Sequence, residues 1–445
     1  MEPLPIGHVD EQFNAGTLFT ILPEHRRKHM AIFGTTGAGK STLLRNMIAW
    51  DINSGLGVTV VDPHGDLVQD IIEHHIPRSR LNDVIFLNAK DVERTLGLNI
   101  LESVRPEQQS LTVSNVLSIF QKLWESSWGP RLEDILRNSL FALVEQPVPV
   151  SLLAVPKLLT DAEYRTALLN NVTNPVVLDF FQNTYDQWKD AFREEAISPV
   201  LNKTRAFLSD PRLRAIIGQT TSSFDFRWMM DHNKILLCDL SKGVIGEDNA
   251  RLLGSLIVAK EKLAALSRAD IPEEARVSHV LYVEEAQNFV GDFPSILSEA
   301  RKFKLILVFV TQGIEQLPLD AAFAVFTNCA SLISFRVSNR DAERLKQEFA
   351  MVLPASGLQD LPDYMIYVRA LKTDEHGVSR PTGPHIVKTF PPLETFPDAA
   401  TAAEVIANSR QRFARLRSDV DAKINRFLKP KPDETLVGKT PLRAR

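Results

Sequence analysis

The chain has 445 residues, a formal net charge of −4 and two cysteines. Its length allows two or three domains, and its slightly acidic balance excludes the overall positive field by which strongly basic proteins hold nucleic acid. Any contact with DNA would have to come from local basic patches or from a ring of subunits. Cys238 and Cys329 lie in or next to apolar runs without metal-ligand spacing, so we expect buried thiols in a reducing compartment.

The N-terminal segment, residues 1–13, lacks the basic, apolar and cleavage regions of a secretory signal peptide. No run reaches the ~18 apolar residues that span a bilayer, and the most apolar stretch, Leu305–Val310, has the length of a strand. We therefore expect a cytoplasmic protein, which a partner would have to bring to a membrane.

The first predicted strand, Met30–Phe33, is followed by a glycine-rich loop and a helix. Gly34, Gly39, Lys40 and Ser41 have the G-x-x-x-x-G-K-[ST] spacing of a phosphate-binding loop. The glycines let backbone N–H groups converge on a phosphate, Lys40 can reach the β- and γ-phosphates, and the Ser41 hydroxyl can bind Mg²⁺. We predict ATP and Mg²⁺ as ligands, with these nucleotide-binding residues: Gly34, Thr35, Thr36, Gly37, Ala38, Gly39, Lys40, Ser41 and Thr42.

Two further strands are predicted at Val58–Asp62 and Val84–Asn88. The motif VVDPHGDL places Asp62 at the end of the first of them and His64 and Asp66 shortly after it. The carboxyl ends of strands line the ligand crevice in open α/β sheets, so we expect Asp62 to help frame the site. A single histidine without a second ligand favours a turn residue at His64 over a catalyst or a metal ligand.

From about Leu101 to Asp231 the strand pattern stops, and helical segments alternate with proline and glycine breakers. We interpret the segment as an inserted all-α domain. Its Phe120, Trp124 and Trp128 fall at helical spacing, which favours a helix core face over a stacking surface for nucleic acid. The predicted domains are the N-terminal part of the ATPase domain, the insert, the C-terminal part of the ATPase domain, and a C-terminal helix with a basic tail: residues 1–100, 101–231, 232–390 and 391–445.

After the insert, near-continuous apolar runs return. Such runs are typical of strands buried on both faces, as in a parallel sheet covered by helices. With the helical segments between them, they predict an α/β fold with a doubly wound, mainly parallel sheet. The runs are Lys234–Leu240, Val280–Glu285, Leu305–Val310, Leu332–Val337 and Met365–Leu371.

The strand at Val280–Glu285 ends in two acids. In ATPases with a phosphate-binding loop, a strand-end acid holds the Mg²⁺ hydration shell and the next acid polarises the attacking water. We therefore predict that Glu284 and Ser41 hold the Mg²⁺ ion. Glu285 is the predicted general base. The next strand ends in Thr311 and Gln312, and we favour Gln312 as the residue that senses the γ-phosphate or orients water.

Ring ATPases also need an arginine that reaches the neighbouring active site. The candidates are Arg336, Arg340 and Arg131. Arg336 is ranked first. It lies within an apolar strand, where an unpaired charge is costly and requires a partner, and an ion pair within the chain is the alternative.

After Leu371 the sequence reads as loops, followed by one last helix over about Thr401–Phe427. Apolar residues form one stripe of this helix and arginines lie on its other face, which favours a packing helix with a solvated face over a DNA contact. The tail beyond it is rich in proline and lysine, and we expect it to be disordered.

Together these motifs resemble the HerA/FtsK superfamily of ring-forming P-loop motors and, within it, type IV secretion coupling proteins of the TraD/TraG kind. The resemblance covers about Met30 to Leu371. It implies a RecA-like P-loop fold with an inserted all-α domain, in a hexameric ATPase that moves DNA through a central channel. The insert is associated with recognising the DNA–relaxase substrate. The matching segments are GTTGAGKST, VVDPHGDL, WGPRLEDILRN, ILLCDLSKGVIGEDNARLLGS, YVEEAQNF, TQ and SFRVSNRDAERL.

Coupling proteins of this kind usually carry N-terminal transmembrane helices, and the residues before Met30 show no such segment. Three interpretations stay open: a soluble variant, a truncated form, and a motor that a partner recruits to the inner membrane. The predicted partners are DNA, single- or double-stranded, a relaxase or secretion-channel proteins. An ATPase that energises protein secretion or channel assembly, a HerA-like DNA-processing ATPase and a non-enzymatic scaffold are the alternatives.

Overall fold

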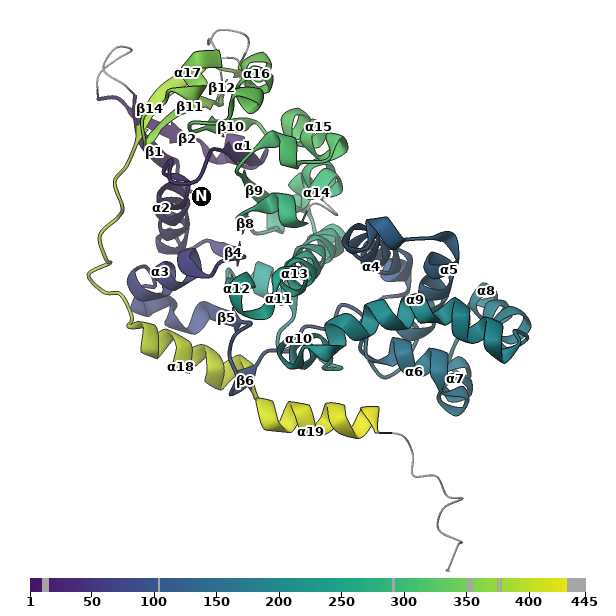
Figure 1. Ribbon diagram of the computed structural model, residues 1–445. Coiled ribbons are helices and arrows are strands. Elements are labelled where there is room, and N and C mark those ends of the chain that lie inside the picture. The colour runs from purple at the N-terminus through teal and green to yellow at the C-terminus, as the bar shows by residue number, and fades with distance from the viewer. Residues whose placement is uncertain are drawn as a thin grey trace, which may run out of the picture.

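The structure is a computed structural model, shown in Figure 1. It describes residues 1–9, 16–102, 105–289, 293–349, 355–373, 376 and 378–429, with the side chains of 355 and 356 left out. The predicted basic tail lies outside the described residues. Among these residues, no helix combines the length and the apolar character that crossing a bilayer requires.

A single sheet of 11 strands forms the centre of the described chain. Seven neighbouring strands, from β10 to β5, run parallel, and the remaining four extend the sheet antiparallel beyond β10. In spatial order the strands are β2 (Leu18–Ile21), β1 (Leu4–Val9), β14 (His385–Thr389), β11 (Met365–Arg369), β10 (Ser331–Ser334), β3 (Met30–Phe33), β9 (Leu305–Thr311), β8 (His279–Val283), β4 (Gly57–Asp62), β7 (Ile235–Asp239) and β5 (Val84–Asn88).

Both faces of the parallel strands are buried, as the continuous apolar runs predict, and alternate residues enter different cores. Ile32 and Val308 face the core under helices α2 (Lys40–Asn53) and α3 (Asp66–His74). Phe33 and Phe309 face the core shared with the helices on the opposite side. These are α13 (Glu247–Ser267), α14 (Phe293–Glu299) and α15 (Leu319–Asn328). The predicted doubly wound, mainly parallel sheet is thus confirmed.

Between β6 (Arg94–Thr95) and β7, the described residues fold into helices that project from one side of the sheet (Figure 1). Helix α4 packs against α13 of the sheet domain, so the insert shares a continuous core with it. Its helices are α4 (Gln109–Leu123), α5 (Pro130–Val144), α6 (Ala154–Thr160), α7 (Ala162–Leu169), α8 (Pro175–Asp179), η5 (Phe180–Tyr185), α9 (Asp190–Ser209), α10 (Pro211–Ile217) and α11 (Phe226–Asp231). The exact domain boundaries stay a prediction.

The aromatic residues at and beyond the end of α4 pack within the insert. Phe120 is buried and stacks on Trp124 with ring centroids 4.7 Å apart, and Trp124 also stacks on Phe207 of α9 at 5.6 Å. Trp128 is partly buried against the same core. The three rings thus pack together as a core face would, although only Phe120 lies within α4, since Trp124 caps the helix and Trp128 follows the 3-10 turn Glu125–Ser127.

The chain after Leu371 is more regular than expected. Strands β12 (Leu371–Thr373) and β13 (Ser379–Pro381) form a hairpin, and β14 joins the central sheet between β1 and β11. The prediction of loops was wrong here, because HIVKT buries Val387 and Thr389 on one face, while on the other face Ile386 packs against a core and Lys388 is exposed. The further helices beside this region are α16 (Asn339–Glu348) and α17 (Ala355–Gln359).

The prediction of a single last helix was also wrong. The expected helix is split into α18 (Ala402–Phe413) and α19 (Arg417–Leu428), because Ala414 is extended and Arg415–Leu416 pairs with β6 as β15. Helix α18 contacts β5 and α3, whereas α19 contacts α10 of the insert (Figure 1). The C-terminal segment therefore links the sheet domain to the insert.

Candidate active site

The loop between β3 and α2 requires glycine for two distinct physical reasons. Gly37 and Gly39 adopt φ angles of 81° and 113°, which side chains other than glycine rarely adopt. A Cβ atom at Gly34 would lie 2.7 Å from the Cβ atom of Phe335, so a larger residue would clash there. The N–H of Thr35 donates to the carbonyl of Arg336 at 2.8 Å, which anchors the start of the loop to the chain after β10.

The side chain of Lys40 curls back over this loop. Its ammonium donates to the carbonyl oxygens of Gly34 at 2.5 Å and Thr35 at 2.8 Å. Burial lowers the pKa of Lys40. The negative charges of Glu284 and Glu285 raise it, but by less. The loop is thus a concave backbone with one cation, at the N-terminus of a helix, which is the arrangement that binds a phosphate.

Oxygen donors from three elements meet beside the loop. The Ser41 hydroxyl lies 3.2 Å from Oε1 of Glu284, at the end of β8. Burial and the neighbouring carboxylate of Asp62 raise the pKa of Glu284 to about 7. Hydroxyl and carboxylate oxygens are the ligands that Mg²⁺ prefers, and a divalent cation would relieve the repulsion between the two acids. The donor set therefore fits Mg²⁺.

Asp62 itself shapes the turn that follows β4. One carboxylate oxygen accepts from the N–H of His64 at 2.8 Å, and the other accepts from the N–H of Val68 at 3.1 Å. Burial raises the pKa of Asp62, and the hydrogen bonds, which lower it, only partly offset this effect. Asp62 thereby fixes the position at which His64 enters the site.

Glu285 is the most extensively contacted acid of the site. On Oε1 it meets Nε2 of His64 at 3.0 Å and the amide nitrogen of Gln312 at 2.9 Å. On Oε2 it meets the ammonium of Lys242 at 2.7 Å and the amide nitrogen of Asn288 at 3.1 Å. Burial alone would raise the pKa of Glu285, but the hydrogen bonds and charges of Lys242 and His64 outweigh it and lower the pKa below its ordinary value.

Glu285 also has a left-handed backbone, with φ at 48°. A residue other than glycine in this region is uncommon and is retained where the surroundings hold it. The turn aims its carboxylate at the loop side of the sheet. The hydroxyl of Thr311, the other candidate at the next strand end, donates to the carbonyl of Gly313 at 3.1 Å.

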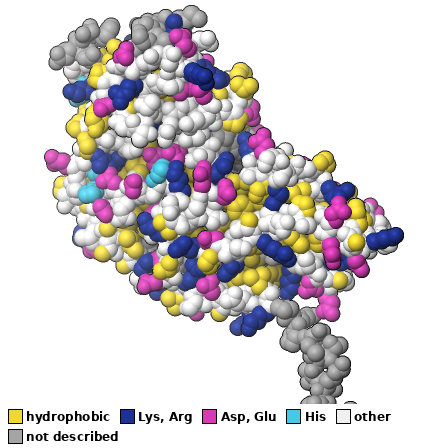
Figure 2. Space-filling view, in the orientation of Figure 1, with side chains coloured by type: hydrophobic (Ala, Val, Ile, Leu, Met, Phe, Trp, Pro, Cys, Tyr) yellow, Lys and Arg dark blue, Asp and Glu magenta, His cyan; other side chains and the backbone are white. Residues whose placement is uncertain are grey.

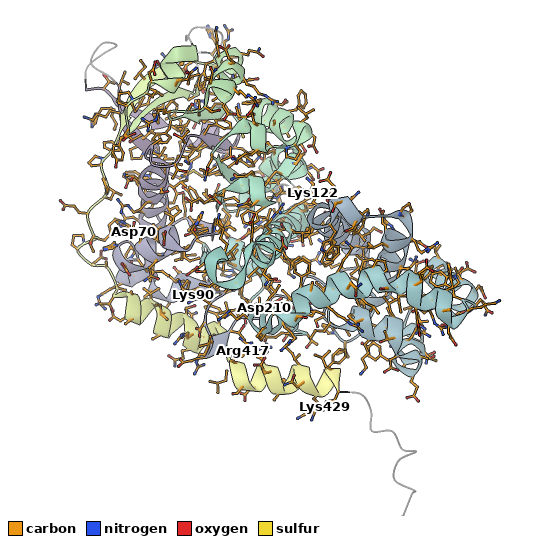
Figure 3. The ribbon with its side chains drawn as sticks, viewed as in Figure 1. Asp70, Lys90, Lys122, Asp210, Arg417 and Lys429 are labelled. Carbon is orange, nitrogen blue, oxygen red and sulfur yellow. The ribbon has the colours of Figure 1, made fainter. Side chains whose placement is uncertain are left out.

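One open cleft contains most of these groups and has a volume of about 680 Å³. Asp70, which extends from α3 in Figure 3, lies on its wall and pairs with Arg45 of α2 at 2.7 Å. The cleft is lined by Thr36, Gly37, Gly39, Lys40, Ser41, Thr42, Arg45, His64, Asp66, Leu67, Asp70, Glu284, Glu285, Val310, Thr311, Gln312 and Tyr364.

The three arginine candidates are not among the described residues that line the cleft. Arg336 pairs with Asp363 of the same chain at 3.0 Å, but the prediction that it lies within a strand was wrong, because β10 ends at Ser334 and the Arg336 side chain is 39% exposed. Arg340 is 81% exposed and lies 3.5 Å from Glu315. Arg131 lies in the insert, 3.9 Å from Glu195. The role of any of them toward a neighbouring subunit stays a prediction.

Sequence reasoning missed several contributors to this site, among them His64, Lys242, Asn288 and Tyr364. His64 was interpreted as a turn residue, which it is, but its ring also contacts Glu285. Lys242 begins the short helix α12 (Lys242–Ile245), just after β7. Its place after a parallel strand was the signal that could have found it. Asn288 lies in the 3-10 helix Ala286–Phe289 and Tyr364 lies in a turn, where no local pattern predicts the direction of either side chain.

The chain matches the family model described as the central domain of the helicase HerA over residues 21–260. No curated protein matches it significantly. Among solved structures, the plasmid coupling protein TrwB in complex with ADP and Mg²⁺ is 20% identical, with 86% of this chain and 90% of that chain covered at a TM-score of 0.59. TrwB with the ATP analogue ADPNP is 19% identical, with 86% and 89% covered and a TM-score of 0.56.

VirB4 of Thermoanaerobacter pseudethanolicus is 15% identical, with 87% of this chain and 96% of that chain covered at a TM-score of 0.51. At these identities the likeness shows a shared fold. The alignments extend over most of both chains.

Proposed function

The chain belongs to the family of the HerA helicase central domain, and on that premise we propose that it is an ATP-hydrolysing ring motor that moves DNA. One observation carries the proposal. A phosphate-binding loop, the Mg²⁺-type donors Ser41 and Glu284, and the acid Glu285 with its contact Gln312 all face one cleft. This is the set of parts that hydrolysis of a nucleoside triphosphate requires.

In the proposed complex the loop backbone and Lys40 hold the β- and γ-phosphates of ATP. Ser41 and Glu284 would hold Mg²⁺, which, when bound, neutralises charge on the phosphate oxygens. TrwB, which shares the fold, has been observed with ADP and Mg²⁺. The raised pKa of Glu284 fits this role, because a carboxylate that is costly to charge in isolation gains most from a neighbouring cation.

Glu285 is the proposed general base. A water held by Glu285 and Gln312 attacks the γ-phosphorus, the bond to the β-phosphate oxygen breaks, and the water's proton passes to the Glu285 carboxylate. The products are ADP and phosphate. The lowered pKa of Glu285 keeps this carboxylate ionised at neutral pH, which a base requires. Lys242 lies on the far oxygen of the carboxylate and acts as a positioning residue.

The proposed assembly is a hexamer in the cytoplasm, with DNA as its substrate and a relaxase or secretion-channel proteins as partners. The chain does not carry a large basic field, so DNA contacts would come from local basic patches or from a ring of subunits, and we propose the ring. Positive and negative side chains are interspersed over the face in Figure 2. Several arginines of the C-terminal helices pair within the chain, including Arg410 with Asp91 at 2.7 Å and Arg417 with Asp421 at 3.0 Å.

The proposed function is tested by ATP turnover with and without single- and double-stranded DNA at several salt concentrations. We expect DNA to raise turnover at low salt, and the effect to fade steeply as salt rises, because phosphate contacts release counterions. If DNA neither binds nor raises turnover at low salt, while ATP is still hydrolysed, the motor proposal is overturned in favour of an ATPase that energises protein secretion or channel assembly.

Lys242→Ala is expected to lower kcat by roughly ten- to a hundred-fold and to leave KM for ATP nearly unchanged, because Lys242 orients Glu285 without lining the cleft. The matched control is Lys234→Ala. Lys234 precedes the other end of β7 and pairs with Asp83 at 2.6 Å. Steady-state kinetics of both variants separate a local effect on Glu285 from a general loss of one ion pair. Equal loss in both variants would contradict the positioning role.

A further inference from the structure

Tyr364 has an unusual conformation at the mouth of the cleft. Its φ angle is 64°, a left-handed value that is a genuine outlier for a bulky residue. Its side chain is 44% exposed and lines the same cleft as the phosphate-binding loop. An aromatic ring that is held in a strained turn and still exposed indicates a function outside the core.

The backbone of Tyr364 is fixed from both sides. Its N–H donates to the carbonyl of Ala38 at 3.0 Å, and its own carbonyl accepts from the N–H and the hydroxyl of Thr389 at 2.9 and 3.0 Å. The ring lies against the loop, since a Cβ atom built on Gly39 would be 2.9 Å from its Cδ1 atom. Glycine at position 39 therefore leaves room for the ring as well as for the turn.

The turn before Tyr364 is held by Arg336. Its guanidinium pairs with Asp363 at 3.0 Å and donates to the carbonyl of Leu361 at 3.3 Å. The carbonyl of Arg336 accepts from Thr35 of the loop. Arg336 thus couples the loop to the turn that presents the ring, which is a role within its own subunit.

The sheet order indicates what the ring faces. Glu285 and Gln312 follow β8 and β9, on one side of β3, whereas Tyr364 precedes β11, on the other side beyond β10. The γ-phosphate must point toward Glu285, so the nucleoside end of a bound nucleotide lies away from it. Among the described residues that line the cleft, His64 and Tyr364 carry aromatic rings, and His64 contacts Glu285.

We propose that the Tyr364 ring is the surface on which the nucleobase of the bound nucleotide stacks, with Arg336 as its positioning residue. This inference rests on the proposed nucleotide site. Stacking on an aromatic ring uses the face of the base and tolerates different bases. A stacking contact of this kind does not by itself discriminate strongly between ATP and GTP.

The test compares Tyr364→Ala with the unaltered chain by calorimetry, using the ATP analogue ADPNP, the GTP analogue GDPNP and inorganic tripolyphosphate as ligands. We expect about ten-fold weaker binding of both nucleotides, which is within the range for loss of one stacking contact. Binding of tripolyphosphate, which has no base, stays unchanged. Tyr364→Phe keeps the ring and should bind the nucleotides as the unaltered chain does.

The control is Phe323→Ala, which removes a 71% exposed ring from α15, away from the cleft lining. If Tyr364→Ala does not fold, Tyr364→Trp replaces it, and ADPNP but not tripolyphosphate should quench the added fluorescence. Unchanged nucleotide affinity in Tyr364→Ala overturns the inference, and so does an equal loss for tripolyphosphate or the absence of base-dependent quenching. If the unaltered chain binds none of the three ligands, the nucleotide site itself fails.

Discussion

Lys40→Ala is expected to weaken ATP binding by about ten- to a hundred-fold and to remove measurable hydrolysis. The ammonium now donates to two loop carbonyls, those of Gly34 and Thr35, and it is the cation of the concave loop. A phosphate oxygen would take over these hydrogen bonds. A hydrogen bond to a charged partner contributes about 1.5–3 kcal/mol, which corresponds to that range of affinity.

Equilibrium binding of a nucleotide analogue with Mg²⁺ measures this effect, and thermal unfolding checks that the loop variant is folded. Lys90→Ala is the matched control. Lys90 lies after β5 and pairs with the buried Asp239 at 2.8 Å, near the same edge of the sheet but outside the cleft lining (Figure 3). Loss of binding in both variants would indicate a general electrostatic effect. Unchanged affinity in Lys40→Ala would refute the assignment of the loop.

The parallel core of the fold was predictable from sequence because it depends on local composition. The run at Leu305–Val310 is apolar throughout and the run at Val58–Asp62 is mostly so, and both strands are buried, since helices cover both of their faces. The strand His385–Thr389 was missed because its polar and apolar residues are mixed within five positions. The break between α18 and α19 was missed for another reason. Leu416 fits a helical stripe, but pairing with Arg94 of β6 holds it extended and 47% exposed.

The residues of the candidate site can also be divided into those that local sequence predicts and those that it does not. Gly39, Lys40 and Ser41 belong to one contiguous motif, so their proximity follows from the chain itself. Glu284 and Gln312 are predictable because carboxyl ends of neighbouring parallel strands share one edge. Tyr364 reaches the loop through a turn beyond β10, held by contacts with Ala38 and Thr389 that are distant in sequence. No local pattern encodes such contacts.

Glu285→Gln is expected to lower ATP turnover by about 10²–10⁴-fold, which is the usual contribution of a general base, and to leave ATP binding nearly intact. The amide is isosteric with the carboxylate and can still accept hydrogen bonds at one oxygen, but it cannot take a proton from water. The phosphate contacts of Lys40 and the Mg²⁺-type donors are unaltered. Single-turnover kinetics and nucleotide binding on the same preparation separate the two effects.

Two further variants test whether the loss of turnover is specific to Glu285. Glu73→Gln, on the exposed face of α3, controls for loss of one negative charge and should hydrolyse ATP normally. Glu284→Gln should instead weaken Mg²⁺-dependent binding, because Glu284 lies 3.2 Å from the Ser41 hydroxyl. If Glu285→Gln keeps turnover within ten-fold of the unaltered chain, the base lies elsewhere. The contacts of Glu285 with Lys242 and His64 would then serve only to hold the turn after β8.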